Sequence, residues 1–340
     1  MTQLLISPNW LPEHKKHIDK NFLEWFIGFS EGDGSFIVSK YKNKNGTTAN
    51  YERHFFIILR NQKEAQILYN IRTTLGFGTV KKYRNKQQSG KISWNYRYVV
   101  SDLDGIKRLI NIFAGNLILD KTNKRFKVWV NAYNLRPTTI PISLPDNPQS
   151  HIEKNVLGTR NAWLSGFIDA EGCFNCQYNI LRIRGGIWDK NISSDWDKSL
   201  DPVYKIRLRF LLDQKDETSL FEALQSLFGA GRLDSRKERE NMYRYSLEIS
   251  KTLGPARRRR HETEITSNTK LAFKKLFDYL NDYPLRTTKN IDFVRFKKIW
   301  VRLYDSANVS RIDSANLETR RFKRLVNLLN SIGNASAERK

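Results

Sequence analysis

Cysteine and long apolar runs are both scarce in this chain. Cys173 and Cys176 are the two cysteines among 340 residues. No second Cys or His pair stands at ligand spacing to complete a zinc site, so we expect ordinary strand residues in a reducing compartment. No apolar run approaches the ~20 residues that a membrane helix needs, and the N-terminus lacks a signal-peptide pattern. We therefore expect neither a disulfide-stapled nor a membrane-spanning protein.

Acidic residues are outnumbered by basic ones. The 59 Lys and Arg against 35 Asp and Glu leave a net charge of +24. Such an excess attracts a polyanion, and nucleic acid is the commonest one. The basic residues alternate with aromatic ones in "KKYRNK" (81–86) and "NYRYVV" (95–100), which favours a folded nucleic-acid surface over a disordered basic tail.

Proline is rare except in one place. Four of the nine prolines fall in "RPTTIPISLPDNP" (136–148). Because proline is excluded from helix interiors and central strands, this stretch predicts a surface linker. We expect a first domain over residues 1–135, a linker over 136–155, a second domain over 156–310 and a C-terminal helical tail over 311–340.

The most informative feature is an internal repeat. "WFIGFSEGDGSF" (25–36) is echoed by "WLSGFIDAEGCF" (163–174). Segments 58–78 and 211–231 also match, with Gln62 opposite Gln214. "YRY" occurs at 96–98 and 243–245, and "RFKVW" (125–129) answers "RFKKIW" (295–300). Four matches in one order predict a duplicated domain.

Each copy predicts an α+β fold. An apolar helix runs into the acidic motif, and strands follow at 35–41 and 53–59 or at 173–180 and 203–212. A helix, two more strands and further helices complete the pattern αββαββα. We expect two pseudo-twofold related domains, each with a four-stranded antiparallel sheet covered by helices on one face. Extra residues at 184–202 and 254–268 predict loops in the second copy.

Alternation along "KIRLRFLL" (205–212) indicates how the other face of the sheet is used. One set of side chains is apolar and should pack on the helices: Ile206, Leu208, Phe210 and Leu212. The other set points outward: Lys205, Arg207, Arg209 and Leu211. A basic open face of this kind suits a DNA groove.

Small residues four apart mark the two acidic helices. Gly28 and Gly32, and likewise Gly166 and Ala170, share a helix face. Small residues at this spacing let helix backbones approach closely, so we expect the two helices to pack against each other.

Asp33 and Glu171 end these helices, each followed by a glycine suited to a left-handed cap. A carboxylate at this end opposes the helix dipole, and two together repel each other. A divalent cation would relieve both effects, and oxygen-only ligands favour Mg²⁺. Two carboxylates and cations beside a basic sheet indicate a phosphodiester hydrolase.

The two motifs resemble the signature of LAGLIDADG homing endonucleases in their single-chain, two-motif form, over about residues 22–305. The resemblance implies that Asp33 and Glu171 bind the catalytic metal, helped by the carbonyls of Gly32 and Ala170. It implies Mg²⁺ as cofactor, with Ca²⁺ supporting binding without cleavage. Glu31 and Asp169 would be structural. Gln62 and Gln214 would order water, and Lys121 with Arg286, or Lys289, would assist catalysis.

Alternation past each motif predicts the DNA-facing side chains. In the first domain they are Ser35, Ile37, Ser39, Tyr41, Arg53, Thr79, Lys81, Tyr83, Asn95 and Arg97. In the second domain they are Asn175, Gln177, Asn179, Arg207, Arg209, Arg232, Asp234, Arg236 and Arg244. Arg and Lys would read guanine, and Asn and Gln adenine.

The leading hypothesis is a site-specific, Mg²⁺-dependent DNA endonuclease that cuts both strands of a long asymmetric target and leaves 3′ overhangs. By the resemblance it would be a mitochondrial monomer bound to double-stranded DNA. One alternative is an intron-encoded RNA maturase, for which "PARRRRHE" (255–262) is the candidate contact with host intron RNA. The other is a non-catalytic DNA-binding regulator, although such proteins usually lose the motif acids and both persist here.

Overall fold

The computed structural model describes residues 18–42, 49–59, 62–86, 90, 92–144, 160–181, 203–236, 239–253, 267–304 and 320–337. The expected loop at 184–202, most of the one at 254–268 and the basic segment 255–262 lie outside these ranges.

The first half contains two helix–strand–strand units followed by two helices. Its elements are α1 (Lys20–Asp33), β1 (Gly34–Lys42), β2 (Ala49–Leu59), α2 (Gln62–Leu75), β3 (Thr79–Lys86), β4 (Ile92–Val100), α3 (Leu103–Phe113) and α4 (Asp120–Asn134).

The second half repeats this order and adds a helix at its end. Its elements are α5 (Trp163–Glu171), β5 (Gly172–Leu181), β6 (Val203–Lys215), α6 (Thr218–Phe228), β7 (Arg232–Ser235), β8 (Met242–Leu253), α7 (Ser267–Asp282), α8 (Lys289–Tyr304) and α10 (Arg320–Ala337).

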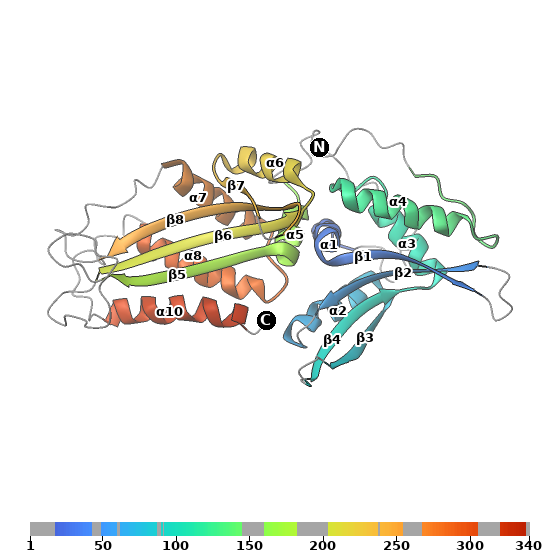
Figure 1. Ribbon diagram of the computed structural model, residues 1–340, viewed down its shortest axis with the longest axis horizontal. Coiled ribbons are helices and arrows are strands. Elements are labelled where there is room, and N and C mark those ends of the chain that lie inside the picture. The colour runs from blue at the N-terminus through green and yellow to red at the C-terminus, as the bar shows by residue number, and fades with distance from the viewer. Residues whose placement is uncertain are drawn as a thin grey trace.

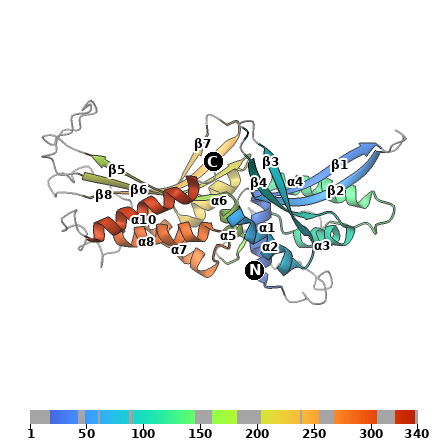
Figure 2. The same cartoon turned by 90° about the horizontal axis from the view of Figure 1, so that it is seen from below.

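Each half forms one antiparallel four-stranded sheet, in the orders β1-β2-β4-β3 and β5-β6-β8-β7. The two halves lie side by side with α1 and α5 between them (Figure 1). Helices α7, α8 and α10 gather on one side of the second sheet (Figure 2). The predicted α+β fold of two related domains is confirmed.

Side-chain alternation fixes which face of each sheet is buried. Phe55 and Ile57 of β2 are buried, as are Ile206, Leu208 and Phe210 of β6. In β5, Cys173 pairs with Leu211 and Cys176 with the buried Leu208, so the two cysteines point to opposite faces, as the strand prediction requires.

The cores also align the two copies more accurately than the sequence matches do. Phe36 contacts Phe126 and Trp129, with both ring centroids at 5.3 Å. Its counterpart Phe174 contacts Phe293 at 5.5 Å and Phe296 at 5.4 Å. Phe126 therefore corresponds to Phe293. The proposed match of 125–129 with 295–300 was wrong by about one helical turn, because both helices repeat aromatic residues at helical spacing.

The central feature is the pair of helices α1 and α5, which pack backbone to backbone. A methyl group on Gly28 would lie 2.0 Å from the Trp163 carbonyl oxygen, and one on Gly166 would lie 1.9 Å from that of Trp25. Gly32 faces Ala170, whose Cβ is 2.3 Å from where a Gly32 Cβ would be. The predicted close pairing through small residues is confirmed.

The glycines that follow the two acids serve a different purpose from the one predicted. Gly34 and Gly172 have φ of −84° and −71°, in extended backbone, so neither is a left-handed cap. A Cβ at Gly34 would lie 2.3 Å from the Ser30 carbonyl oxygen, and one at Gly172 would lie 2.6 Å from that of Ile168. Glycine therefore lets the chain turn directly from helix into strand.

Among the described helices, none is both long and apolar enough to cross a bilayer.

The helix pair yields a stability prediction. Gly28→Ala adds one methyl group against a backbone carbonyl that cannot rotate away, and such overpacking typically costs about 1–3 kcal/mol or more. The melting temperature of the DNA-free protein should fall by several degrees. Thr73→Ala, at an exposed position of α2, is the control and should leave it unchanged. Equal melting of the two variants would contradict the close packing.

Candidate active site

The two predicted metal-binding acids lie where the central helices end together. Asp33 is the last residue of α1 and Glu171 the last of α5. A methyl group on Gly32 would lie 3.6 Å from Glu171 Oε1, so this carboxylate rests against the opposite helix. The structure thus brings together two acids that are 138 positions apart.

The surroundings of Glu171 disfavour its charge. Burial, together with the nearby carboxylates of Asp33 and Asp213, raises the pKa of Glu171 to about 7, against the opposing effect of Lys289. A divalent cation between the acids would reverse this balance, so the donor set fits a metal that prefers oxygen ligands. Within the described ranges, no group of three or more His, Cys, Asp or Glu gathers as a complete site. Further ligands would have to be carbonyl, water or phosphate oxygens.

The other acid of each motif, Glu31 or Asp169, is buried and accepts hydrogen bonds that hold helices together. Glu31 accepts hydrogen bonds from the backbone N–H groups of Ile118 (3.0 Å) and Leu119 (2.7 Å), just before α4. It also accepts one from the indole N–H of Trp163, at 2.6 Å across the helix pair. Burial raises the pKa of Glu31 to about 8, although these donors act to lower it.

Asp169 repeats this arrangement in the second half. It accepts from the N–H of Arg286 at 2.7 Å, from the Thr287 hydroxyl at 2.5 Å and from the indole N–H of Trp25 at 2.8 Å. Burial raises the pKa of Asp169 as well. Each buried acid therefore ties the end of its own helix to a later helix and to the tryptophan of the other half. The repeated tryptophans at the start of both motifs were the available sequence signal for this exchange.

These contacts also establish which basic residues correspond. Lys121 follows the amide of Leu119 by two residues, and Lys289 follows that of Thr287 by two, so the two lysines match when counted from these amides. Between these amides and the matched rings of Phe126 and Phe293 the second half has one residue fewer. Lys289 is 6% exposed, and its ammonium donates to the carbonyls of Ile168 at 3.1 Å and Ala170 at 2.8 Å.

Arg286, the other candidate, points away from the acids. Its guanidinium lies 5.2 Å from the Phe22 ring and 5.8 Å from the Trp25 ring, and 3.6 Å from Asp19. These partners belong to the first two turns of α1, whereas Asp33 is at its other end. The geometry favours Lys289 as the counterpart of Lys121.

The two glutamines are not in equivalent places. Strand register matches Gln214 with Leu59 and not with Gln62, because Gln214 pairs with Tyr243 and Leu59 with Tyr96, the first tyrosines of the two "YRY" segments. Gln214 lies in strand β6, whereas Gln62 begins helix α2. The side chain of Gln62 is outside the described residues. Gln62 therefore stands three positions beyond the residue that strand register matches with Gln214.

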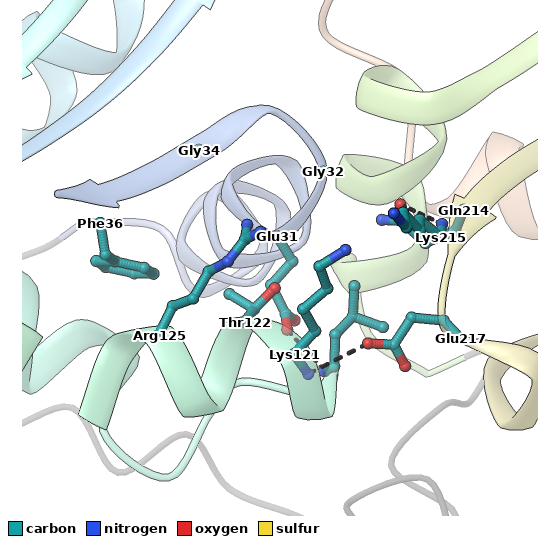
Figure 3. Close-up of a pocket in the computed structure, with 11 residues that line it drawn as sticks. Glu31, Gly32, Gly34, Phe36, Lys121, Thr122, Arg125, Gln214, Lys215 and Glu217 are labelled. Atoms are coloured by element: carbon teal, nitrogen blue, oxygen red, sulfur yellow. Dashed lines mark hydrogen bonds between the residues drawn. The ribbon is translucent and has the colours of Figure 1, made fainter. Parts of the chain in front are cut away.

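Gln214 and Lys121, from different halves, line one small pocket of about 70 Å³. Its wall includes Glu31 and Gly32 of α1, Arg125 of α4, and Lys215 and Glu217 of the second half. Figure 3 shows the Lys121 side chain extending across this pocket toward Gln214. Two predicted catalytic side chains therefore meet at the junction of the halves, beside the end of α1.

The open face of the first sheet carries most of its predicted DNA-facing residues. Register pairs Ser35 with Phe56, Lys81 with Arg97 and Tyr83 with Asn95, on the side opposite the buried residues. The exposed or half-buried members on this side are Ser35, Ile37, Ser39, Thr79, Lys81, Tyr83, Asn95 and Arg97. The Arg97 guanidinium lies 4.5 Å from the Tyr83 ring.

Two first-half predictions have a different outcome. Arg53 pairs with Val38, on the same side as the buried pair Phe36 and Phe55. The register therefore does not support the prediction that Arg53 faces DNA. His54, which pairs with Ile37, lies on the open face instead. The prediction started the alternation of β2 one residue too early. The side chains of Arg53 and Tyr41 are outside the described residues.

The open face of the second sheet is covered with paired polar groups. Arg209 donates to Asn175 Oδ1 at 2.8 Å, and Arg207 lies 2.9 Å from Glu248. Arg232 lies 2.6 Å from Asp234. The guanidinium of Arg244 donates two hydrogen bonds, of 2.5 and 2.6 Å, to the carboxylate of Asp213. Gln177 and Asn179 are exposed along β5, and Arg236 directly follows β7.

Most of this chain is similar to known proteins. Residues 26–133, 164–256 and 246–300 match the LAGLIDADG endonuclease family. A probable intron-encoded endonuclease of Neurospora crassa is 34% identical over 286 residues, which are 84% of this chain and 41% of that protein. A probable intron-encoded endonuclease of Dictyostelium citrinum is 24% identical, over 84% of this chain and 98% of its own length. The chain thus spans less than half of the Neurospora relative.

Solved structures share the fold. Meganuclease I-SmaMI, bound to DNA that it cannot cleave, matches with a TM-score of 0.57 at 17% identity, over 93% of this chain and 99% of its own. The LAGLIDADG homing endonuclease I-GzeII, in complex with its DNA target, matches with a TM-score of 0.53 at 15% identity, over 90% and 96%.

The contacts of Glu31 generate the prediction for this site. In Glu31→Gln an amide NH₂ would face one of the three N–H groups that the carboxylate accepts, leaving a buried donor without an acceptor, which costs about 1–3 kcal/mol. The melting temperature should fall, whereas Glu222→Gln, at an exposed position of α6, should melt like the unaltered protein. A Glu31→Gln variant as stable as Glu222→Gln would show that this acid does not hold the helices.

Proposed function

Because the chain belongs to the LAGLIDADG endonuclease family, we propose that it is a site-specific DNA endonuclease that cuts both strands of a long asymmetric target and leaves 3′ overhangs. The observation that carries this proposal is the meeting of Asp33 and Glu171 at the ends of two helices packed in backbone contact. Two sheets with open polar faces flank this point, one for each half of a target.

Asp33 and Glu171 would hold Mg²⁺ together with the carbonyl oxygens of Gly32 and Ala170, and Ca²⁺ would support DNA binding without cleavage. The cation would supply charge stabilisation at the scissile phosphates and lower the pKa of bound water. The protein's part is to keep two carboxylates close together in spite of the burial and the repulsion that raise the pKa of Glu171. DNA phosphates would complete the set of oxygen ligands.

Polar side chains around the acids would act on water and on the phosphates. Gln214 would orient a water molecule, and Lys121 in the same pocket would stabilise charge that develops on the phosphate. In the second half, Lys289 is the better candidate for the role first given to Arg286, because its ammonium lies at the Ala170 carbonyl. Gln62 remains a candidate from sequence.

Sequence recognition would come from the two open sheet faces. The residues proposed for it stand at alternating strand positions, or in the case of Arg236 directly after a strand: Ser35, Ile37, Ser39, Thr79, Lys81, Tyr83, Asn95 and Arg97 in the first half, and Asn175, Gln177, Asn179, Arg207, Arg209, Arg232, Asp234, Arg236 and Arg244 in the second. Their different composition in the two halves supports an asymmetric target. The relatives' description as intron-encoded supports a mitochondrial protein, and the family match in both halves of one chain supports action as a monomer.

The acids provide the decisive test. Asp33→Asn and Glu171→Gln keep the size of each side chain but remove the charge that holds the cation, while the basic sheets remain. Target binding in Ca²⁺ should persist in a gel-shift assay, and cleavage of target DNA in Mg²⁺ should be lost in both variants.

Glu31→Gln is the matched control, because this acid faces backbone N–H groups instead of the cation site. It should retain measurable cleavage at a temperature where it is folded. Normal double-strand cutting by either Asp33→Asn or Glu171→Gln would refute the proposed active site.

A variant of Arg209 tests the proposed recognition of DNA bases. Asn175 orients its guanidinium, which favours a two-bond contact with guanine, so Arg209→Ala should relax base preference in one half of the target at a cost of about 1–3 kcal/mol. Selection from randomised targets measures this. Arg72→Ala, on the exposed surface of α2, should keep the preference. A uniform loss of affinity across all targets would assign Arg209 to a phosphate.

A further inference from the structure

The two equivalent lysines are anchored in different ways. Lys289 is buried and donates to the carbonyls of Ile168 and Ala170, in its own half. The Lys121 side chain is 34% exposed, and its ammonium lies 3.2 Å from Asp216 of the other half. Placement of the Lys121 ammonium therefore depends on a carboxylate of the second half.

The backbone around Asp216 is unusual. Asp216 has φ of 62°, in the left-handed region that residues other than glycine rarely adopt, and Asn241 has φ of 55°. The Asp216 N–H donates to the Asn241 carbonyl at 2.9 Å, which joins the end of β6 to the start of β8. Asn or Gly would suit this backbone as well as Asp does. A carboxylate at this position has a specific partner, the Lys121 ammonium.

A second acid of the same loop holds the backbone of Lys121. The neighbouring Glu217 is 3% exposed and accepts the Lys121 N–H at 3.3 Å. Helix α4 has no side-chain cap of its own at Leu119. Two consecutive acids of the second half thus hold the main chain and the ammonium of one lysine in the first half.

Gln214 lies in β6, two residues before Asp216. Gln214, Lys121 and Glu217 line the same pocket next to Gly32, and Figure 3 shows the Lys121 side chain directed toward Gln214. Asp216 therefore determines where the Lys121 ammonium lies relative to Gln214 and to the end of α1.

We propose that Asp216 is a positioning residue that holds Lys121 at one of the two cutting sites, so that cleavage of one DNA strand depends on a carboxylate from the opposite half. This inference rests on the endonuclease activity proposed above. The ion pair is partly exposed, and such pairs add little to folding stability. The ion pair instead orients the Lys121 ammonium, and the rate of a reaction at a phosphate is sensitive to such orientation.

The test uses Asp216→Asn, which keeps the left-handed backbone accessible and removes the charge. Single-turnover cleavage of a target labelled differently on each strand gives one rate per strand. Asp216→Asn should slow one strand by about ten- to a hundredfold, leave the other unchanged and accumulate nicked DNA. Target binding in Ca²⁺ and the melting temperature should stay the same. Glu222→Gln removes a negative charge from an exposed position of the same half and should cut both strands normally.

A double-mutant cycle identifies the route of the effect. In a Lys121→Met background, Asp216→Asn should cause no further loss, since the residue acts through Lys121. Further loss in that background, equal slowing of both strands, faster cutting, or no change would each overturn the positioning role. Failure of the unaltered protein to cut any target strand in a library of candidate sites would refute the endonuclease activity itself, a result distinct from normal cutting by Asp216→Asn.

Discussion

The contact between the backbones of α1 and α5 is the constraint on which the rest of this structure depends. Gly28 and Gly166 each leave no room for a Cβ against a carbonyl oxygen of the other helix. This contact sets how close Asp33 and Glu171 come, because both residues end these helices. It also sets where the two sheets begin, since β1 and β5 start at the next residue.

Hydrogen bonds across the helix pair make this arrangement specific. The indole of Trp25 donates to Asp169, and that of Trp163 donates to Glu31. Glu24 accepts the N–H of Ala162, where α5 has no side-chain cap of its own. Apolar packing alone would tolerate small rotations of one helix against the other. Buried polar groups that must all be satisfied permit fewer arrangements, and the positions of the acids are correspondingly well defined.

Most of the fold was predictable from sequence because the duplication doubles every signal. The helix pair, the sheets and the alternation in 205–212 follow from patterns with a clear physical period. Short matches placed by identity were less reliable: "RFK" slipped by about one helical turn, and Gln62 stands three positions from Leu59, the residue that strand register matches with Gln214. Identity of a few residues carries little information about register, whereas contacts such as Phe36 with Phe126 determine it.

The duplication also made part of the candidate active site predictable. The acids are marked by repeated motifs, so their meeting was foreseeable. The choice between Arg286 and Lys289 was not, because both lie near the start of α8 and the direction of a side chain depends on its neighbours. The aromatic rings of Phe22 and Trp25 draw Arg286 toward the start of α1. The interaction of Lys121 with Asp216 joins residues 95 positions apart and has no sequence signature.

The burial of α1 has a consequence for synthesis of the protein. Residues Phe22 to Glu31 are buried, and part of that cover comes from α5, which leaves the ribosome more than a hundred residues later. At about 5–20 residues per second, the first half waits many seconds with its glycine-lined helix face uncovered. During that interval the face could pair with the same face of another nascent chain, so folding yield should depend on how fast the second half is translated.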